Sequence, residues 1–288
     1  MLSPVSLSLS VVLITLNEEQ NLGRTLASVK PLVGDGQGEI IVVDSGSTDR
    51  TVEIAKSYGA KVFVEEWKGF AAQKNSAIEK AAGEWVLSLD ADEEMTEELR
   101  RAVKLSLQFL QTKALSNADG CWLHNVVGIR DPGATVGFRI RRRNFFLGRP
   151  LRWGGFYPDP KLRLVRKEVA NFEPRPVHED MICPSGSVAE IWTPLLHHSY
   201  PTLDTYLEHM RRYADLGAEM IKDKPRWWLW LNRWLNPPLT FFYNYVVRLG
   251  FLDGREGFLL HWNHRRYVGW KYAKALELHS KPTADERG

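Results

Sequence analysis

The sequence predicts an α/β fold, in which a mostly parallel sheet flanked by helices is followed by a C-terminal helical extension. Strand and helix signals alternate through the first half of the 288 residues. Such an alternation implies parallel strands joined by right-handed crossovers. Beyond residue 200, apolar residues recur every three or four positions instead. We therefore expect an α/β domain over residues 1–200 and a helical extension over residues 201–288.

The elements of the first domain follow from local patterns. Runs rich in β-branched and apolar residues predict strands over 7–16, 40–43, 61–64, 85–89, 120–127 and 161–165. Helical spacing and capping residues predict helices over 17–28, 52–58, 71–82 and 96–111. The run Ile40–Val43 is wholly apolar, which is typical of a strand buried on both faces. Lys161–Val165 alternates charged and apolar residues, so we expect a half-exposed strand there.

The extension is aromatic and basic. Helical spacing begins at Leu203, and the segment Arg226–Arg266 interleaves aromatic rings with arginines. Pro237 and Pro238 lie within it, and proline interrupts the helical hydrogen-bond ladder. We therefore expect two pieces, each too short to cross the ~30 Å of hydrocarbon in a bilayer. The segment resembles an interfacial helix pair that binds an anionic membrane surface, and packing onto the α/β domain is the alternative.

Composition narrows the function classes. Lysine and arginine exceed aspartate and glutamate by only 38 − 35 = 3, so we expect no nucleic-acid partner. Cys121 and Cys183 match no metal-ligand spacing and suit a reducing compartment. No charged n-region opens the chain, and no apolar run reaches the ~18 residues of a membrane span. We expect a cytoplasmic protein, with peripheral contact at the inner face of the plasma membrane left open.

Polar residues follow three predicted strands at the point where each strand ends. The stretch Thr15–Glu18 follows the first strand, Asp44 the second, and Asp90 and Asp92 the fourth. In open α/β sheets, ligands bind at the carboxyl ends of the strands. One such residue is well explained as a helix cap, but three endings at one edge predict a ligand site.

The triplet Asp90-Ala91-Asp92 is the sharpest of these features. If the chain stays extended, residues i and i+2 point to the same side. Two carboxylates on one side would bind Mg²⁺ or Mn²⁺, with diphosphate oxygens completing the coordination shell. The alternative is that Asp92, Glu93 and Glu94 only complement the dipole of the helix that begins near Thr96.

Four segments now match a family. Residues Val12–Glu19, Ile41–Asp49, Gln73–Asn75 and Trp85–Glu93 resemble family 2 glycosyltransferases with the GT-A fold, in order and correctly spaced over the first hundred residues. Three later segments, Pro176–Glu179, His197–Tyr200 and Gly250–Phe258, are similar to bacterial lipopolysaccharide-core glucosyltransferases. The Gln-x-x-Arg-Trp motif of processive synthases is absent, which indicates that one sugar is transferred to each acceptor.

The resemblance implies a nucleotide-sugar site with a divalent cation, Mg²⁺ or Mn²⁺, and a UDP-sugar as donor. Thr15, Asn17 and Glu18 would hold the base and ribose, and Asp44 would contact one of these. Lys74 would face the nucleotide, although without the resemblance a solvated position on an alanine-rich helix is the preferred interpretation. Asp90 would reach the ribose or the metal, and Asp92 would be the direct metal ligand.

The catalytic base is expected further along the chain. Inverting transfer needs a carboxylate that takes the proton of the acceptor hydroxyl. The Val-His-Glu triplet carries the resemblance, so Glu179 is the implied base. Asp180 is the alternative, because the wider family often places its base at the end of an x-Glu-Asp motif. His178 and His197 would orient the site or meet metal or diphosphate.

The expected function is metal-dependent, inverting, non-processive transfer of one hexose to a lipid-linked bacterial glycan such as lipopolysaccharide core. Glucose from UDP-glucose is the donor that the resemblance implies. The cation-rich stretch Gly137–Lys167, in which Asp159 is the one acid, would meet donor phosphates or an anionic acceptor. A polyprenyl-phosphate sugar transferase is a second enzyme interpretation, and a non-catalytic carbohydrate- or membrane-binding module is the interpretation without chemistry.

Overall fold

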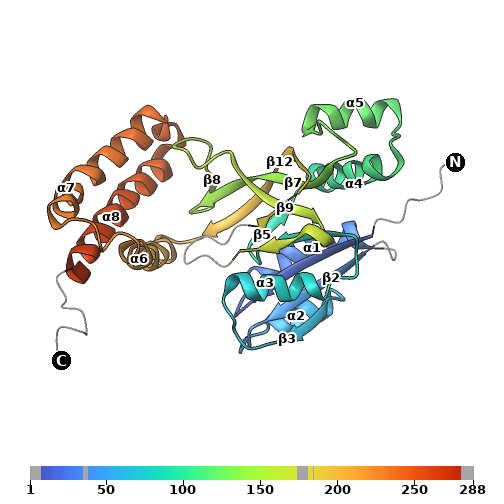
Figure 1. Cartoon of the computed structure of the whole chain (residues 1–288), viewed down its shortest axis with the longest axis horizontal. Helices are drawn as coiled ribbons and strands as arrows, with labels where there is room; N and C mark the ends of the chain where they lie inside the picture. The colour runs from blue at the N-terminus through green and yellow to red at the C-terminus, as the bar shows by residue number, and fades with distance from the viewer. Residues whose placement is uncertain (1–7, 35–37, 174–180, 184, 280–288) are drawn as a thin grey trace. The chain divides into compact units, whose positions relative to one another are not determined.

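The computed structural model describes residues 8–34, 38–173, 181–183 and 185–279. The chain forms two compact units, both drawn in Figure 1. The first holds the residues up to Arg142 together with Asp159–His197, and the second holds Arg143–Pro158 together with the residues from His198 on. A segment from the middle of the chain therefore belongs with the C-terminal helices.

The first unit is built on a mixed sheet in the order β3-β2-β1-β4-β9-β7-β12-β5. Strands β1 to β4 run parallel, and β9 then pairs with β4 in the antiparallel sense. The strands are β1 (Leu9–Thr15), β2 (Gly38–Asp44), β3 (Lys61–Val64), β4 (Trp85–Leu89), β5 (Glu93–Met95), β6 (Val127–Gly128), β7 (Thr135–Phe146), β9 (Asp159–Arg166) and β12 (Ser187–Tyr200). A separate two-stranded pair joins β10 (Asn171–Phe172) to β11 (Met181–Ile182).

Helices cover both faces of this sheet (Figure 1). They are α1 (Leu22–Val33), α2 (Thr51–Ser57), α3 (Phe70–Glu79), α4 (Glu97–Thr112) and α5 (Asn117–Val126), and a 3₁₀ turn spans Lys167–Val169. Apolar residues of α1 and α4 pack on one face, and residues of α3 pack on the other. This arrangement confirms the predicted α/β class, with its mostly parallel sheet and flanking helices.

The buried parallel strands confirm the interpretation of the short apolar runs. In β2, Ile40 and Val42 belong to one core cluster, whereas Ile41 and Val43 belong to the other. A strand covered by helices on both faces has no solvent side, and its sequence therefore has no polar alternation. The carboxyl ends of β1, β2 and β4 meet at one edge of the sheet, since these three strands are neighbours and parallel.

Two predicted elements differ from the structure. Residues 120–127 were expected as a strand, but Asn117–Val126 form α5, whose start is capped by the hydroxyl of Ser116 accepting from the Asp119 amide. The first helix begins at Leu22 and not at Asn17, which has a φ of 55°. A left-handed residue cannot continue a right-handed helix, so the chain turns at Asn17 before α1 starts.

Strand β9 contains a bulge that the sequence does not mark. Phe138 of β7 pairs with Leu164, but Arg139 pairs with Leu162, so Arg163 is the extra residue of a β-bulge. Leu162 and Leu164 consequently face opposite sides of the sheet, and Arg163 between them is 5% exposed. The predicted strand is confirmed, but the expectation that it is half-exposed is wrong, because residues 162–165 are all buried.

The second unit contains the helical extension and a short hairpin. Its elements are β8 (Arg149–Pro150), α6 (Leu203–Glu219), α7 (Arg226–Phe242), the π-helical turn η2 (Tyr243–Val247), the 3₁₀ turn η3 (Gly250–Asp253) and α8 (Gly254–His279). Contrary to expectation, α7 runs through Pro237 and Pro238 as one helix that packs along α8. None of the helices that the structure describes combines the length and apolar character of a membrane span.

Two histidines of α8, the buried His261 and the partly buried His264, predict a loss of stability in mild acid. Burial lowers the pKa of His261 and of His264 from 6.5 to about 4, and the neighbouring charges of His264 and Lys271 act in the same direction. A group whose pKa falls on folding binds its proton more tightly when unfolded. The stability is therefore complete above pH 6.5 and declines as pH falls towards 4. By pH 5 we expect a loss of about 2 kcal/mol per histidine.

Thermal unfolding between pH 7 and pH 5 measures this effect. His264→Asn should reduce the pH dependence of Tm, whereas His124→Asn, at an exposed position, should leave it unchanged. A Tm that stays constant over this range in the parent protein would contradict the expectation.

Candidate functional site

The loops after β1 and β2 are tied together by a buried hydrogen-bond network. The Thr15 hydroxyl donates to Asp44 Oδ2 at 2.8 Å, and the Ser47 hydroxyl donates to the same oxygen at 2.5 Å. Asp44 Oδ1 accepts from the backbone amides of Gly46 and Ser47. Asp44 is 0% exposed, so its carboxylate fixes the shape of this loop. The implied contact of Thr15 and Asp44 with base or ribose stays a prediction.

Asn17 and Glu18 lie beside these loops at the same edge. The Thr48 amide donates to Asn17 Oδ1 at 2.9 Å, and the Glu18 amide donates to the Thr51 hydroxyl oxygen at 2.7 Å. Burial raises the pKa of Glu18; the hydrogen bond from Asn21 opposes this, and the charge of Asp92 reinforces it. Glu18 is thus close enough to Asp92 to be repelled by it. The structure thus brings the ends of β1, β2 and β4 together, as the prediction of one site requires.

Asp90 lies between two cations. Lys74 Nζ is 3.0 Å from Asp90 Oδ1, and Arg163 Nη2 donates to Asp90 Oδ2 at 2.5 Å. Burial raises the pKa of Asp90, but the charges of Arg163 and Lys74 outweigh it and hold that pKa well below its ordinary value. Lys74 is 7% exposed, which excludes the solvated helix position that the sequence left open.

The chain of charges extends beyond Asp90 through a residue that sequence reasoning missed. Glu93 is 0% exposed, and its Oε1 accepts from Arg163 Nη2 at 2.5 Å and lies 3.6 Å from Arg142 Nη1. Arg142 in turn donates to Asp159 Oδ2 at 2.7 Å. Burial lowers the pKa of Arg163, but Asp90 and Glu93 raise it further, so the guanidinium stays charged. Alternating charges therefore link α3 to three strands.

The stretch Asp90–Asp92 does not stay extended, contrary to the geometry on which the two-carboxylate prediction depends. The chain turns at Ala91, the Glu93 amide donates to the Asp90 carbonyl at 3.1 Å, and the Asp90 amide donates to Glu93 Oε2 at 3.0 Å. The dipole interpretation is not supported either, because the acids in the first turn of α4 are Glu97 and Glu98. Thr96 caps that helix by accepting from the Leu99 amide.

Asp92 is the carboxylate of this stretch that pairs with a histidine. His197 Nε2 lies 3.3 Å from Asp92 Oδ2, because β12 pairs with β5 and sets His197 opposite Glu93. Burial raises the pKa of Asp92, but His197 more than offsets it, so the net direction is downward and Asp92 is ionised at neutral pH. Its side chain is 25% exposed. The sequence did place His197 among the residues that would orient the site.

These residues fit a divalent cation only in part. Among the described residues, no three His, Cys, Asp or Glu side chains converge as a metal site. Asp92 and His197 offer an oxygen and a nitrogen at one point, and Mg²⁺ ordinarily takes one or two carboxylates and completes its shell with substrate phosphates and water. The donor set therefore suits a cation that arrives with a diphosphate. Asp90 is already paired with two cations, so Asp92 is the better ligand.

The predicted base lies outside the described residues. Glu179 and Asp180, together with His178, fall within residues 174–180, which the structure does not describe. Their roles stay predictions, as does the choice between the two carboxylates.

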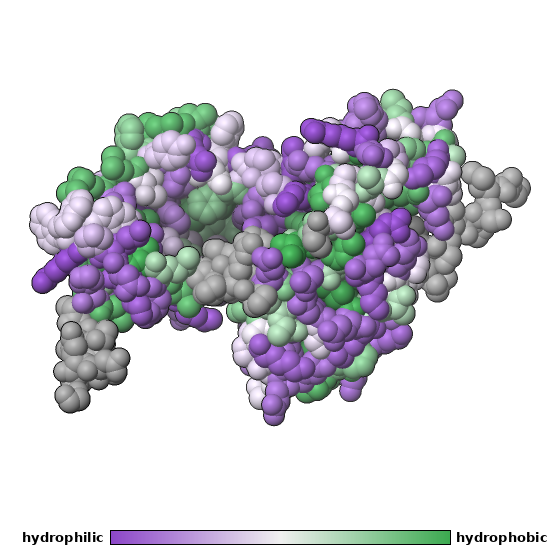
Figure 2. Space-filling model, in the orientation of Figure 1, coloured by the Kyte–Doolittle hydropathy of each residue, from purple (hydrophilic) through white to green (hydrophobic). Residues whose placement is uncertain are grey.

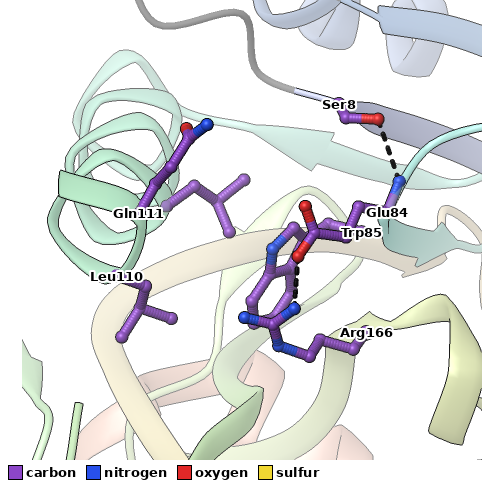
Figure 3. Close-up of a pocket in the computed structure, with 7 residues that line it drawn as sticks. Ser8, Glu84, Trp85, Leu110, Gln111 and Arg166 are labelled. Atoms are coloured by element: carbon purple, nitrogen blue, oxygen red, sulfur yellow. Dashed lines mark hydrogen bonds and ion pairs between the residues drawn. The ribbon is translucent and has the colours of Figure 1, made fainter. Parts of the chain in front are cut away.

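A cavity of about 260 Å³ lies elsewhere on the first unit (Figure 3). It is lined by Ser8, Glu84, Trp85, Leu107, Leu110, Gln111 and Arg166. Figure 3 shows Arg166 paired with Glu84 across its wall. Trp85 is the first residue of β4, so this cavity is at the amino ends of the strands. Ligands of such sheets bind at the opposite ends, and we assign the cavity no chemistry.

The buried charge chain predicts a large stability effect. Arg163→Met would remove the cation that pairs with the fully buried Glu93 and the partly buried Asp90, and breaking a buried pair typically costs about 3–5 kcal/mol. Arg166→Met on the same strand is the matched control, because its pair with Glu84 is exposed and worth ~0–1 kcal/mol. Urea unfolding of both variants measures the difference. Equal losses would contradict the structural role of Arg163.

The comparisons with known proteins agree with this geometry. A family model described as Glycosyl transferase family 2 matches residues 10–171. The lipopolysaccharide core biosynthesis glycosyltransferase LpsC of Rhizobium meliloti is 28% identical over 298 residues, which is 97% of each chain. A glycosyltransferase of Rickettsia typhi is 45% identical over 96 residues, 33% of this chain and 32% of that protein.

A solved structure shares the fold. The mannosyltransferase PcManGT of Pyrobaculum calidifontis, solved with GDP-Man and Mn²⁺, aligns with a TM-score of 0.54 at 15% identity, covering 93% of this chain and 87% of that one. This similarity confirms the GT-A fold that the sequence resemblance implies. With the family model spanning more than half of the residues, the chain belongs to glycosyl transferase family 2 and is a glycosyltransferase.

Proposed function

We propose that this protein is an inverting, metal-dependent, non-processive glycosyltransferase. In this proposal it transfers one hexose, glucose from UDP-glucose, to a lipid-linked bacterial glycan such as lipopolysaccharide core. The observation that carries the proposal is the ionised, partly exposed Asp92, which lies at the carboxyl edge of the sheet. The full-length similarity to LpsC supports the acceptor class, and the complex of PcManGT with GDP-Man and Mn²⁺ supports a nucleotide sugar and a cation.

Residues of the first unit would bind and position the nucleotide sugar. Thr15, Asn17, Glu18 and Asp44 shape the loops that would hold the base and ribose. Lys74 would meet a pyrimidine carbonyl or a phosphate oxygen, with its ammonium group positioned by Asp90. Arg163 keeps Asp90 in place, so it is a positioning residue in this account.

The transfer itself is a displacement at the sugar C1. The acceptor hydroxyl oxygen forms a bond to C1 while the bond from C1 to the diphosphate oxygen breaks, and Glu179 takes the hydroxyl proton. When bound at Asp92, a divalent cation would stabilise the charge of the departing nucleoside diphosphate. Because the incoming and leaving oxygens are on opposite faces of C1, the anomeric configuration inverts.

A donor panel tests the proposal. Thermal shifts would be measured with UDP-glucose, GDP-mannose and dTDP-glucose, each with and without Mn²⁺. We expect stabilisation by UDP-glucose that depends on Mn²⁺, because Asp92 binds the diphosphate through the cation. A larger shift with another nucleotide would overturn the donor assignment, and a shift that is equal without metal would overturn the role of the cation.

A further inference from the structure

The outward face of α7 is apolar along its length. Its side chains recur at intervals of three or four residues, which places them on one side of the helix. We call the following residues the outer stripe: Trp227 (68% exposed), Trp230 (59%), Leu231 (40%), Trp234 (61%), Leu235 (49%), Leu239 (59%) and Phe242 (56%). In Figure 2 the surface over the outer edge of α7 is mostly green and pale.

The inward face of the same helix carries its asparagines. Asn236 Nδ2 donates to the Tyr272 hydroxyl oxygen of α8 at 2.7 Å and to Asn232 Oδ1 at 2.7 Å. A helix that faces water ordinarily points its apolar stripe at the core and its polar residues outwards. In α7, Trp227, Trp230 and Trp234 are exposed although Leu229 is fully buried on the inward side, so the helix carries apolar residues on both faces and lacks the polar outer face expected in water.

The apolar surface continues past the end of α7. Exposed side chains of η2, η3 and the start of α8 extend it: Tyr243, Val246, Val247, Phe251, Leu252, Phe258 and Trp262. Phe258 and Trp262 stack on each other with ring centroids 5.8 Å apart. A contiguous apolar surface of this kind marks an interaction site.

The cations around this surface favour an anionic partner. Three guanidinium groups lie over its rings: Arg233 over Trp234 at 5.7 Å, Arg248 over Tyr243 at 5.1 Å, and Arg265 over Trp262 at 3.9 Å. Between Lys224 and Trp262 the sequence has two acids, Asp253 and Glu256. Asp253 is 3% exposed and accepts from the backbone amides of Arg152 and Trp153. Glu256 is 20% exposed and pairs with Arg149 at 3.2 Å, so neither acid presents an unpaired charge that would oppose an anionic surface.

We propose that this surface docks on an anionic lipid bilayer, with α7 lying in the plane of the interface. The outer stripe would enter the boundary between headgroups and acyl chains, where tryptophan is favoured, and the arginines would meet lipid phosphates. The 17 residues of α7 make a helix about 25 Å long, which suits a position along the surface. This inference depends on the surface alone, not on the proposed donor or acceptor.

Vesicle co-sedimentation of the full chain tests the proposal. The vesicles are phosphatidylcholine alone or phosphatidylcholine with phosphatidylglycerol. We expect binding to the anionic vesicles that weakens as salt is raised. Trp230→Ser with Trp234→Ser should weaken the partition constant on the order of a hundredfold, about tenfold for each ring removed from the interface. Trp67→Ser, at a 48% exposed ring of the first unit, is the matched control and should leave binding unchanged.

Two outcomes would overturn the proposal. One is vesicle binding that the double substitution does not weaken, because the lipid-binding surface of the protein would then lie elsewhere. The other is absence of binding at low salt together with a dimer that the same substitutions dissociate, which would make the stripe an interface between copies. Circular dichroism checks that the variants fold. If the tryptophan pair does not fold, Leu235→Ser with Leu239→Ser on the same stripe takes its place.

Discussion

Asp92→Asn is expected to abolish metal-dependent turnover while the protein stays folded. The amide keeps the shape of the side chain and can still meet His197, but it lacks the charge that binds the cation. Without stabilisation of the departing diphosphate, kcat should fall by roughly 10²–10³. The measurement is release of UDP from UDP-glucose with acceptor and Mn²⁺.

Glu94→Gln is the matched control for this variant. It removes a charge from the same stretch, at a side chain that is 32% exposed and 3.8 Å from Arg24. An exposed ion pair is worth ~0–1 kcal/mol, so activity and stability should stay close to those of the parent. If Asp92→Asn keeps near-parental activity that EDTA still removes, the cation binds at another residue.

The second large effect is expected at the predicted base. Glu179→Gln should lose transfer to the acceptor but keep donor binding, because a base acts on the acceptor hydroxyl and not on the nucleotide. Loss of a general base typically costs ~10²–10⁴ in rate. Initial rates with acceptor, compared with UDP-glucose binding by calorimetry, separate the two steps.

Asp180→Asn decides between the two carboxylates. We expect the Asp180→Asn variant to retain transfer of the sugar to the acceptor. If Asp180→Asn is inactive and Glu179→Gln is active, Asp180 is the base and the assignment from the Val-His-Glu triplet is wrong.

The parallel part of the sheet could be predicted because its strands are buried on both faces. A run such as Ile40–Val43 has no polar residue to interrupt it, and its length alone separates it from a helix. The predicted topology places the polar residues that end β1, β2 and β4 at one edge, and the hydrogen bond from Thr15 to Asp44 confirms that the first two endings meet.

The parts that could not be predicted depend on distant contacts. The bulge that turns Arg163 towards Asp90 and Glu93 arises from pairing between β7 and β9. The alternation of charged and apolar residues in Lys161–Val165 instead predicts that Arg163 faces solvent. The burial of Glu93 has a similar origin, because its partner Arg163 is 70 residues away. The one sequence feature that pointed to the buried pair of Arg163 and Glu93 is the excess of arginine in the stretch Gly137–Lys167.

Two further predictions from local patterns were wrong. Residues 120–127 have the apolar look of a strand, yet the Ser116 cap starts a helix there. Pro237 and Pro238 remove two backbone donors, but contact with α8 along its length keeps α7 continuous. The first failure has a local cause, the Ser116 cap, whereas in the second a tertiary contact outweighs local propensity.

We have proposed that this glycosyltransferase moves a sugar from a nucleotide donor with the help of a cation at Asp92. The most direct measurement is UDP release from UDP-glucose by metal-stripped enzyme with a lipopolysaccharide-core acceptor, before and after Mn²⁺ is restored. We expect acceptor-dependent release of UDP that EDTA abolishes and Mn²⁺ restores, and that the Asp92→Asn variant lacks at every Mn²⁺ concentration. Full-rate release by the stripped enzyme, with its lack of metal checked by elemental analysis, would contradict the proposal.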